Sequence, residues 1–165
     1  MKYMNKKRLC MLMVFALILG CVAQVPVHAK KAPSCKSLCS AALKATGGSS
    51  KLKYSSTSAM DFGALSASDR KKVKTIQYVC DTKEVYSLCV IKAKTTSQAK
   101  SLSKVLKNYK KRNCKSDYLS DYSSVERKVF QNAVYGRKGA YVWYIAMSPN
   151  KKTNQKGQTA IQKKL

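Results

Sequence analysis

The chain has 165 residues and is 45% hydrophobic, which is enough apolar material for the core of one domain and argues against wholesale disorder. Its net charge is +26, from 33 lysines and arginines against seven acidic residues, and lysine supplies most of the cations. This balance favours anionic polymers and surfaces as partners. It disfavours bidentate recognition of single phosphates or bases, for which arginine is the better residue.

Residues 1–29 have the pattern of a secretion signal. A basic start precedes an apolar run over residues 10–19, and residues 27–29 form a small-residue cleavage site. An alternative processing site is Cys21, because residues 18–21 resemble a lipobox, at which the cysteine is lipidated. Apolar residues follow Cys21 in place of the usual polar tether, which favours cleavage after Ala29. Both routes predict a secreted or cell-surface protein, and lipidation would make it a membrane-anchored lipoprotein.

Residues 30–165 predict a single α+β domain with the order α-β-β-α-β-β-α, in which two hairpins form a small antiparallel sheet. Ser34 is the expected N-cap of the first helix, which Gly47 ends. The serine-rich residues 49–68 are expected to form a weakly ordered loop. Runs at residues 75–80 and 85–93 predict the first hairpin.

The second half of the domain begins with the strongest helix signal. Thr95 and Gln98 fit a capping box for a helix over residues 95–113. The second hairpin is predicted from apolar runs at residues 129–135 and 140–147, the latter with the only tryptophan. A weak helix is predicted in the basic C-terminal tail, where Gly157 disfavours a rigid one.

The residues available for catalysis are few. His28 is the only histidine, and it leaves with the signal, so the mature chain has no imidazole for general base or metal ligand. The five remaining cysteines favour core packing over a metal site, although a disulfide from Cys114 to another of them stays open. We therefore predict no metal site, no cofactor and no catalytic residue.

Two polar groupings remain as candidate sites. Four lysines line one face of the 95–113 helix and could contact anionic lipid headgroups, wall polymers or nucleic acid, although a solvated helix face would show the same pattern. These are Lys100, Lys104, Lys107 and Lys111. Asp117 and Asp121 are the nearest approach to the paired carboxylates of a glycosidase. In so basic a chain, carboxylates more often cap helices or neutralise lysines.

Four stretches carry a resemblance to a known family: residues 63–73, 86–99, 117–119 and 137–142. On these the chain resembles uncharacterised envelope proteins of Gram-positive bacteria, mostly lipoproteins, that share domain of unknown function 4358. The resemblance implies a place at the cell envelope, and it adds weight to lipidation at Cys21. It brings no active site with it. The lysine excess departs from the acidic or mixed charge of that family.

The predicted function is that of an exported, non-enzymatic accessory or binding domain at the bacterial cell envelope. Its partners would be anionic cell-wall polymers or the membrane surface, and no protein partner is indicated. One alternative is a hydrolase of envelope or nucleic-acid substrates that uses Asp117 and Asp121. Another is a secreted nucleic-acid-binding protein, although the sequence has no specific nucleic-acid signature.

Overall fold

The computed structural model describes residues 32–165, and Ala32–Leu165 forms one compact unit. The secretion signal, the cleavage after Ala29 and the lipidation of Cys21 all fall outside the described residues. Within those residues, no helix is both long enough and apolar enough to cross a bilayer.

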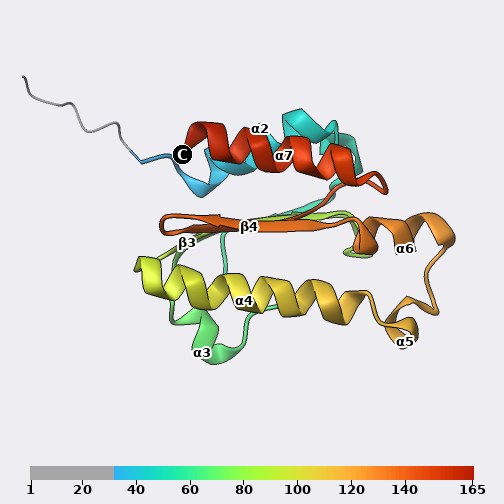
Figure 1. Cartoon of the computed structure of the whole chain (residues 1–165), viewed down its shortest axis with the longest axis horizontal. Coiled ribbons are helices and arrows are strands. Elements are labelled where there is room, and N and C mark those ends of the chain that lie inside the picture. The colour runs from blue at the N-terminus through green and yellow to red at the C-terminus, as the bar shows by residue number, and fades with distance from the viewer. Residues whose placement is uncertain (1–31) are drawn as a thin grey trace, which may run out of the picture. The chain divides into compact units, whose positions relative to one another are not determined.

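An antiparallel five-stranded sheet with helices on both faces confirms the α+β class (Figure 1). The strand order is β1-β2-β3-β5-β4. The elements along the chain are α2 (Cys35–Thr46), η1 (Ser49–Lys51), β1 (Tyr54–Ser56), α3 (Ala67–Arg70), β2 (Val73–Cys80), β3 (Ser87–Ala93), α4 (Thr96–Asn113), α5 (Ser116–Leu119), α6 (Ser124–Gln131), β4 (Val134–Lys138), β5 (Tyr141–Ala146) and α7 (Lys151–Lys164).

The two hairpins join into one sheet because β3 pairs with β5 along most of its length, with Val90 opposite Trp143. All six residues of β5 are buried, so the tryptophan strand lies inside the sheet, as its apolar sequence predicts. One core lies between the sheet and α2 with α7. The other lies between the sheet and α4, and it also takes in Phe62, Leu119 and Phe130. Figure 1 shows these helices on opposite faces of the sheet.

Local caps explain where the longer helices begin. The Ser34 side chain accepts from the Ser37 amide, and Gly47 ends α2 in the left-handed conformation, both as predicted. The Thr95 side chain accepts from the Gln98 amide at the start of α4. The return bond of the predicted capping box does not form, since Gln98 Oε1 has no hydrogen-bond partner.

The predicted strand over residues 129–135 is wrong except at its last two residues, Val134 and Tyr135. A complete capping box between Ser123 and Glu126 starts α6, which continues to Gln131, and β4 begins only at Val134. The apolar pair Val129 and Phe130 therefore belongs to the buried face of a helix, and Gln131 and Asn132 separate it from the apolar start of β4. Strand β4 extends to Lys138, so the hairpin turn lies at Gly139 and Ala140. Gly139 has a φ of +55°, a conformation that glycine adopts readily.

The two segments predicted to be weak contain regular structure. The 49–68 segment carries η1 and the edge strand β1, which pairs with β2 from Tyr54 to Ser56. The C-terminal tail forms α7, a helix of 14 residues that buries Asn154, Gly157 and Ile161. Gly157, which lowers helix propensity, here lets α7 approach α2 closely, because a Cβ at this position would lie 2.8 Å from a Thr46 methyl carbon.

Candidate anion-binding surface

The four predicted lysines all lie on the exposed side of α4. The opposite side of this 18-residue helix buries Leu102, Leu106 and Tyr109 against the sheet. At a rise of about 1.5 Å per residue, the row from Lys100 to Lys111 extends over roughly 16 Å. We call the set Lys100, Lys104, Lys107 and Lys111 the lysine row.

No carboxylate neutralises the lysine row. Helix α4 contains no acidic residue. The salt bridges among residues 32–165 join Lys72 to Asp69, at 2.7 Å, and Lys83 to Glu126, at 3.6 Å. Neither pair includes a residue of α4. The row therefore presents four unpaired cations to solvent.

A fifth lysine of α4 shows which way the row faces. Lys110 donates to the Ala133 carbonyl at 2.6 Å, just before β4 begins. Lys110 and the lysine row are on the same side of the helix, whereas Ser101, on the other side, accepts from Lys72 of the α3–β2 segment. The row therefore lies towards the β4 edge of the sheet. Burial lowers the pKa of Lys110, and the nearby Lys151 of α7 lowers it further.

Asp117 and Asp121 line one surface depression of about 530 Å³, together with Lys83, Tyr118 and Tyr122. Both carboxylates are exposed, and each accepts from the hydroxyl of an adjacent serine. The rings of Tyr118 and Tyr122 stack at a centroid distance of 5.5 Å. The depression therefore combines two exposed carboxylates with a pair of stacked tyrosine rings.

The five cysteines of residues 32–165 lie wholly or partly in the interior. Cys35, Cys39, Cys80 and Cys89 are buried, Cys114 is partly buried, and all five are free thiols. Burial, followed by the neighbouring Cys35, raises the pKa of Cys39 to about 12, which keeps it a neutral thiol. Within residues 32–165, no group of three or more histidine, cysteine, aspartate or glutamate side chains could hold a metal ion. These thiols act as small core residues.

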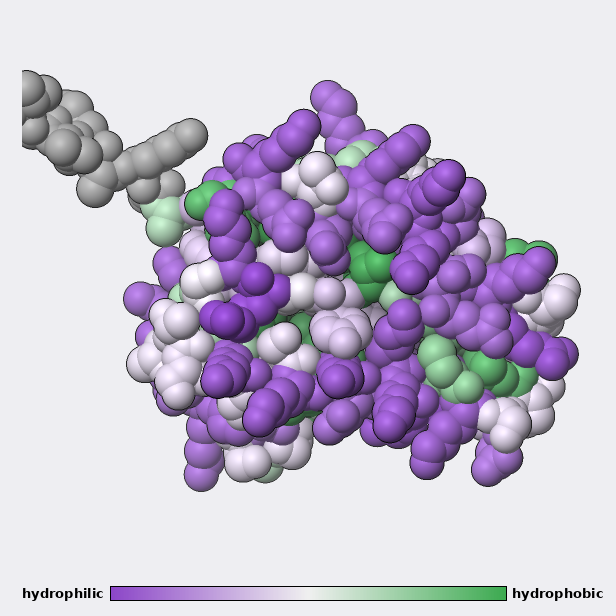
Figure 2. Space-filling view, in the orientation of Figure 1, coloured by the Kyte–Doolittle hydropathy of each residue, from purple (hydrophilic) through white to green (hydrophobic). Residues whose placement is uncertain are grey.

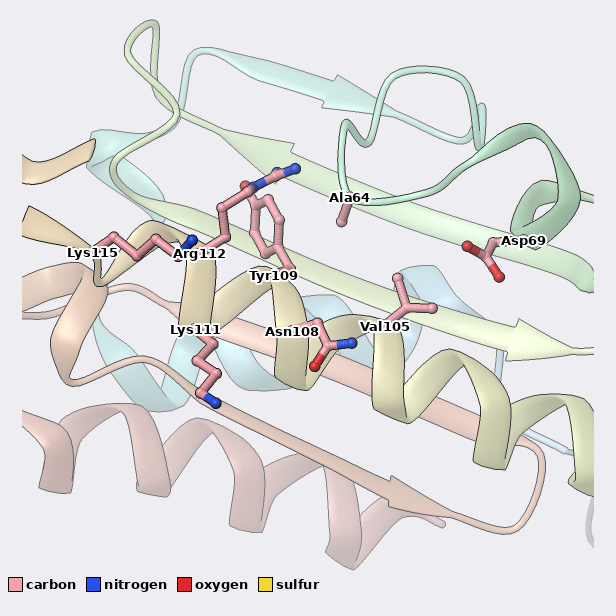
Figure 3. A pocket seen from close by; sticks show the side chains of 8 residues that line it. All are labelled: Ala64, Asp69, Val105, Asn108, Tyr109, Lys111, Arg112 and Lys115. Atoms are coloured by element: carbon pink, nitrogen blue, oxygen red, sulfur yellow. The ribbon is translucent and has the colours of Figure 1, made fainter. Parts of the chain in front are cut away.

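Sequence reasoning missed a second cationic group at the end of α4. A depression of about 510 Å³ is lined by Asn108, Lys111, Arg112 and Lys115, with Tyr109 among them (Figure 3). The i, i+4 spacing of Asn108 and Arg112 was a possible signal in the sequence. The opposite wall, which includes Ala64, comes from the segment before α3, and no local pattern connects that segment to α4.

The molecular surface around these features is strongly polar. Figure 2 shows hydrophilic residues over most of the face it presents, with small, separate hydrophobic areas between them. Large exposed hydrophobic side chains among residues 32–165 are limited to Tyr54, Met60, Tyr118 and Val125.

The chain matches no family model, no curated protein and no solved structure.

Proposed function

We propose that the protein is an exported, non-enzymatic binding domain that contacts anionic polymers or lipids of the bacterial cell envelope through the lysine row. The observation that carries this proposal is the unneutralised row itself, four exposed lysines along one side of a helix without a carboxylate. The export signal over residues 1–29 and the resemblance to envelope proteins support the location. We also propose that the chain belongs to the family that those envelope proteins share.

The type of cation supports a partner with repeated charge. Lysine presents a flexible point charge, which suits an irregular polyanion better than one group held in a fixed geometry. A basic side chain near an anionic surface contributes on the order of 1 kcal/mol, and this contribution falls with ionic strength. Four such side chains would hold the domain on a polyanion without a deep pocket. The hydrolase alternative has weaker support, because Asp117 and Asp121 are both exposed.

Binding by a variant without the row tests the proposal. The fourfold change Lys100→Gln, Lys104→Gln, Lys107→Gln and Lys111→Gln leaves the buried face of α4 intact. The matched control replaces four exposed lysines of α2 and α7 by glutamine, namely Lys36, Lys44, Lys156 and Lys163. Both variants have the same net charge. Retention of each would be measured on purified cell walls, on vesicles with anionic lipid, and on duplex DNA.

We expect the row variant to bind walls or anionic vesicles at least about 100-fold more weakly than wild type, since each lysine contributes on the order of 1 kcal/mol. The control variant should lose much less affinity. Equal losses in the two variants would show that net charge alone drives binding, and the row would then have no special role. Binding only to DNA would favour the nucleic-acid alternative.

A further inference from the structure

The depression at the C-terminal end of α4 combines a cationic rim with an apolar wall. We refer to it as the α4 pocket, lined by Ala64, Asp69, Val105, Asn108, Tyr109, Lys111, Arg112 and Lys115. Figure 3 shows Ala64 facing α4 from the neighbouring loop, with the Tyr109 ring and Val105 on the helix side. The volume of about 510 Å³ lies within the range of small-molecule sites.

The charges of the pocket suit an anion. Two cations, Arg112 and Lys115, line it, and Asn108 adds an amide donor. Lys111 also borders the pocket, but its ammonium group points away from Ala64, to the other side of α4 (Figure 3). The single carboxylate, Asp69, is already occupied. It accepts from Lys72 at 2.7 Å and from the Ser66 hydroxyl at 2.6 Å, and these bonds hold its pKa below the usual value in spite of burial. An incoming anion therefore meets unpaired cations at one end and a neutralised carboxylate at the other.

Basic residues are common in the last turn of a helix, where they complement the helix dipole. The α4 pocket goes beyond that role because Arg112 is held in a defined place. Its guanidinium lies 5.2 Å from the centre of the Tyr109 ring, as a cation–π pair, and Figure 3 shows the two side by side. A planar guanidinium fixed in this way can offer two parallel N–H donors to an oxyanion.

Further polar groups lie behind the pocket wall, in the core. Asn113 is 1% exposed and follows Tyr109 by one helical turn, so both lie on one side of α4. The Asn113 amide opposes the rise in pKa that burial causes at the hydroxyls of Tyr109 and Tyr144, so these polar groups lie close to one another. They belong to the packing behind Tyr109 and do not line the pocket.

We propose that the α4 pocket binds a small organic phosphate, with the phosphate group on Arg112 and Lys115 and a compact apolar body against Ala64 and Val105. The two cations suit a phosphate monoester, which carries close to two negative charges at neutral pH and three acceptor oxygens, better than a carboxylate. This site goes beyond the lysine row, since it selects a single group by shape and charge together.

Titration of the full chain with three probes tests this site. The probes are phenyl phosphate, inorganic phosphate and benzyl alcohol, followed by calorimetry and by amide chemical shifts. We expect phenyl phosphate to bind saturably, about tenfold more tightly than inorganic phosphate because its ring is partly buried, and to shift residues 105–115 most. Benzyl alcohol should not bind. Benzoate in place of phenyl phosphate separates carboxylate from phosphate recognition, and equal affinity for the two would contradict the proposal.

Three variants separate this site from the lysine row. Arg112→Gln with Lys115→Gln should weaken phenyl phosphate binding at least about tenfold, as expected for the loss of charged hydrogen bonds. Ala64→Leu should weaken phenyl phosphate and leave inorganic phosphate unchanged, because it fills the apolar part of the pocket without a change in charge. Lys100→Gln, Lys104→Gln and Lys107→Gln together should weaken polyanion binding and leave phenyl phosphate binding intact. Binding unaffected by Arg112→Gln with Lys115→Gln, or shifts spread over α2 and α7 without saturation, would overturn the proposal.

Discussion

At the scale of single residues, one glycine allows the tryptophan strand to be fully buried. Gly136 of β4 lies opposite Trp143 of β5, and a Cβ built on Gly136 would come within 2.5–2.8 Å of three atoms of the indole ring. The indole is 0% exposed, so it has no free space into which it could move. The absence of a side chain at residue 136 is therefore what makes room for the largest side chain of the core.

The first prediction concerns this contact. Gly136→Ala should lower the free energy of unfolding by about 2–3 kcal/mol, because overpacking of a rigid core forces side chains and backbone to shift. Urea denaturation followed by tryptophan fluorescence measures the change. Gly63→Ala is the control, since nothing lies within 4 Å of a Cβ there, and its effect should stay within about 0.5 kcal/mol. Equal effects of the two substitutions would contradict the tight packing of Gly136 against Trp143.

At the scale of elements, polar caps decide boundaries that apolar patterns leave ambiguous. Val129 and Phe130 are separated from the apolar start of β4 only by residues 131–133, and the sequence pattern predicts all of them in one strand. The capping box of Ser123 and Glu126 assigns the first two to α6, because the helix that it starts extends to Gln131. An apolar run of this length fits a strand and a buried helix equally well, so the start signal carries the information.

In helix α7, tertiary packing outweighs the helix propensity of a single residue. Gly157 is unfavourable for an isolated helix, yet it is buried where α7 crosses α2. A Cβ there would lie 2.8 Å from Thr46 Cγ2 and 3.4 Å from Ile145 Cδ1. Tertiary contact therefore selects the residue that local propensity disfavours.

The prediction at this scale uses two substitutions. Gly157→Ala alone should destabilise the protein by about 1–2 kcal/mol, since the clash outweighs the gain of about 1 kcal/mol in helix propensity. In a Thr46→Ser background the same change should cost less, because serine lacks the methyl group that the new Cβ meets and retains the hydroxyl that bonds to Ala42 and Leu43. Thermal unfolding of the four proteins in this cycle measures the coupling. A rise in melting temperature for Gly157→Ala alone would contradict the close approach of α7 to α2.

At the scale of the whole molecule, acidic residues are absent from the three longest helices of residues 32–165. Helices α2, α4 and α7 together cover both faces of the sheet and contain only basic charged residues. Three of the seven acidic residues, Asp61, Asp81 and Glu84, line one depression beside β1 and the β2–β3 turn. The domain is therefore positive on both faces of the sheet. What distinguishes the lysine row from the other lysines is that its four members are aligned along one side of a helix.

The salt dependence of binding distinguishes an interface at the lysine row from binding driven by the net charge of the whole domain. For a phosphodiester polyanion such as duplex DNA, removal of the four lysines should reduce the slope of log K against log salt concentration by about 3.6, or about 0.9 for each lysine that contacts a phosphate. The control variant on α2 and α7 should reduce the slope by less than about 1. The measurement is binding affinity over a range of salt concentrations. If both variants change the slope equally, contact is spread over the surface and the row is not the interface.

The sequence alone determined the features that depend on neighbours along the chain. Caps, hairpins and amphipathic helix faces depend only on residues that are close along the chain. The sequence therefore predicts the caps at Ser34, Gly47 and Thr95. It also predicts the hairpin of β2 and β3 and the exposure of the lysine row. The α+β class follows from the order of these elements. The strong positive charge follows from the composition alone, and so does the anionic class of partner that we propose.

Contacts between segments that are distant along the chain become visible only in the folded domain. The tertiary fold joined the two hairpins through β3 and β5, added β1 at one edge, and packed Gly157 against α2. It also brought Ala64 against the end of α4, more than forty residues further along the chain, and so created the α4 pocket. These contacts depend on the shapes of both segments and on the burial of the whole core. The periodicity of a single segment gives information on neither.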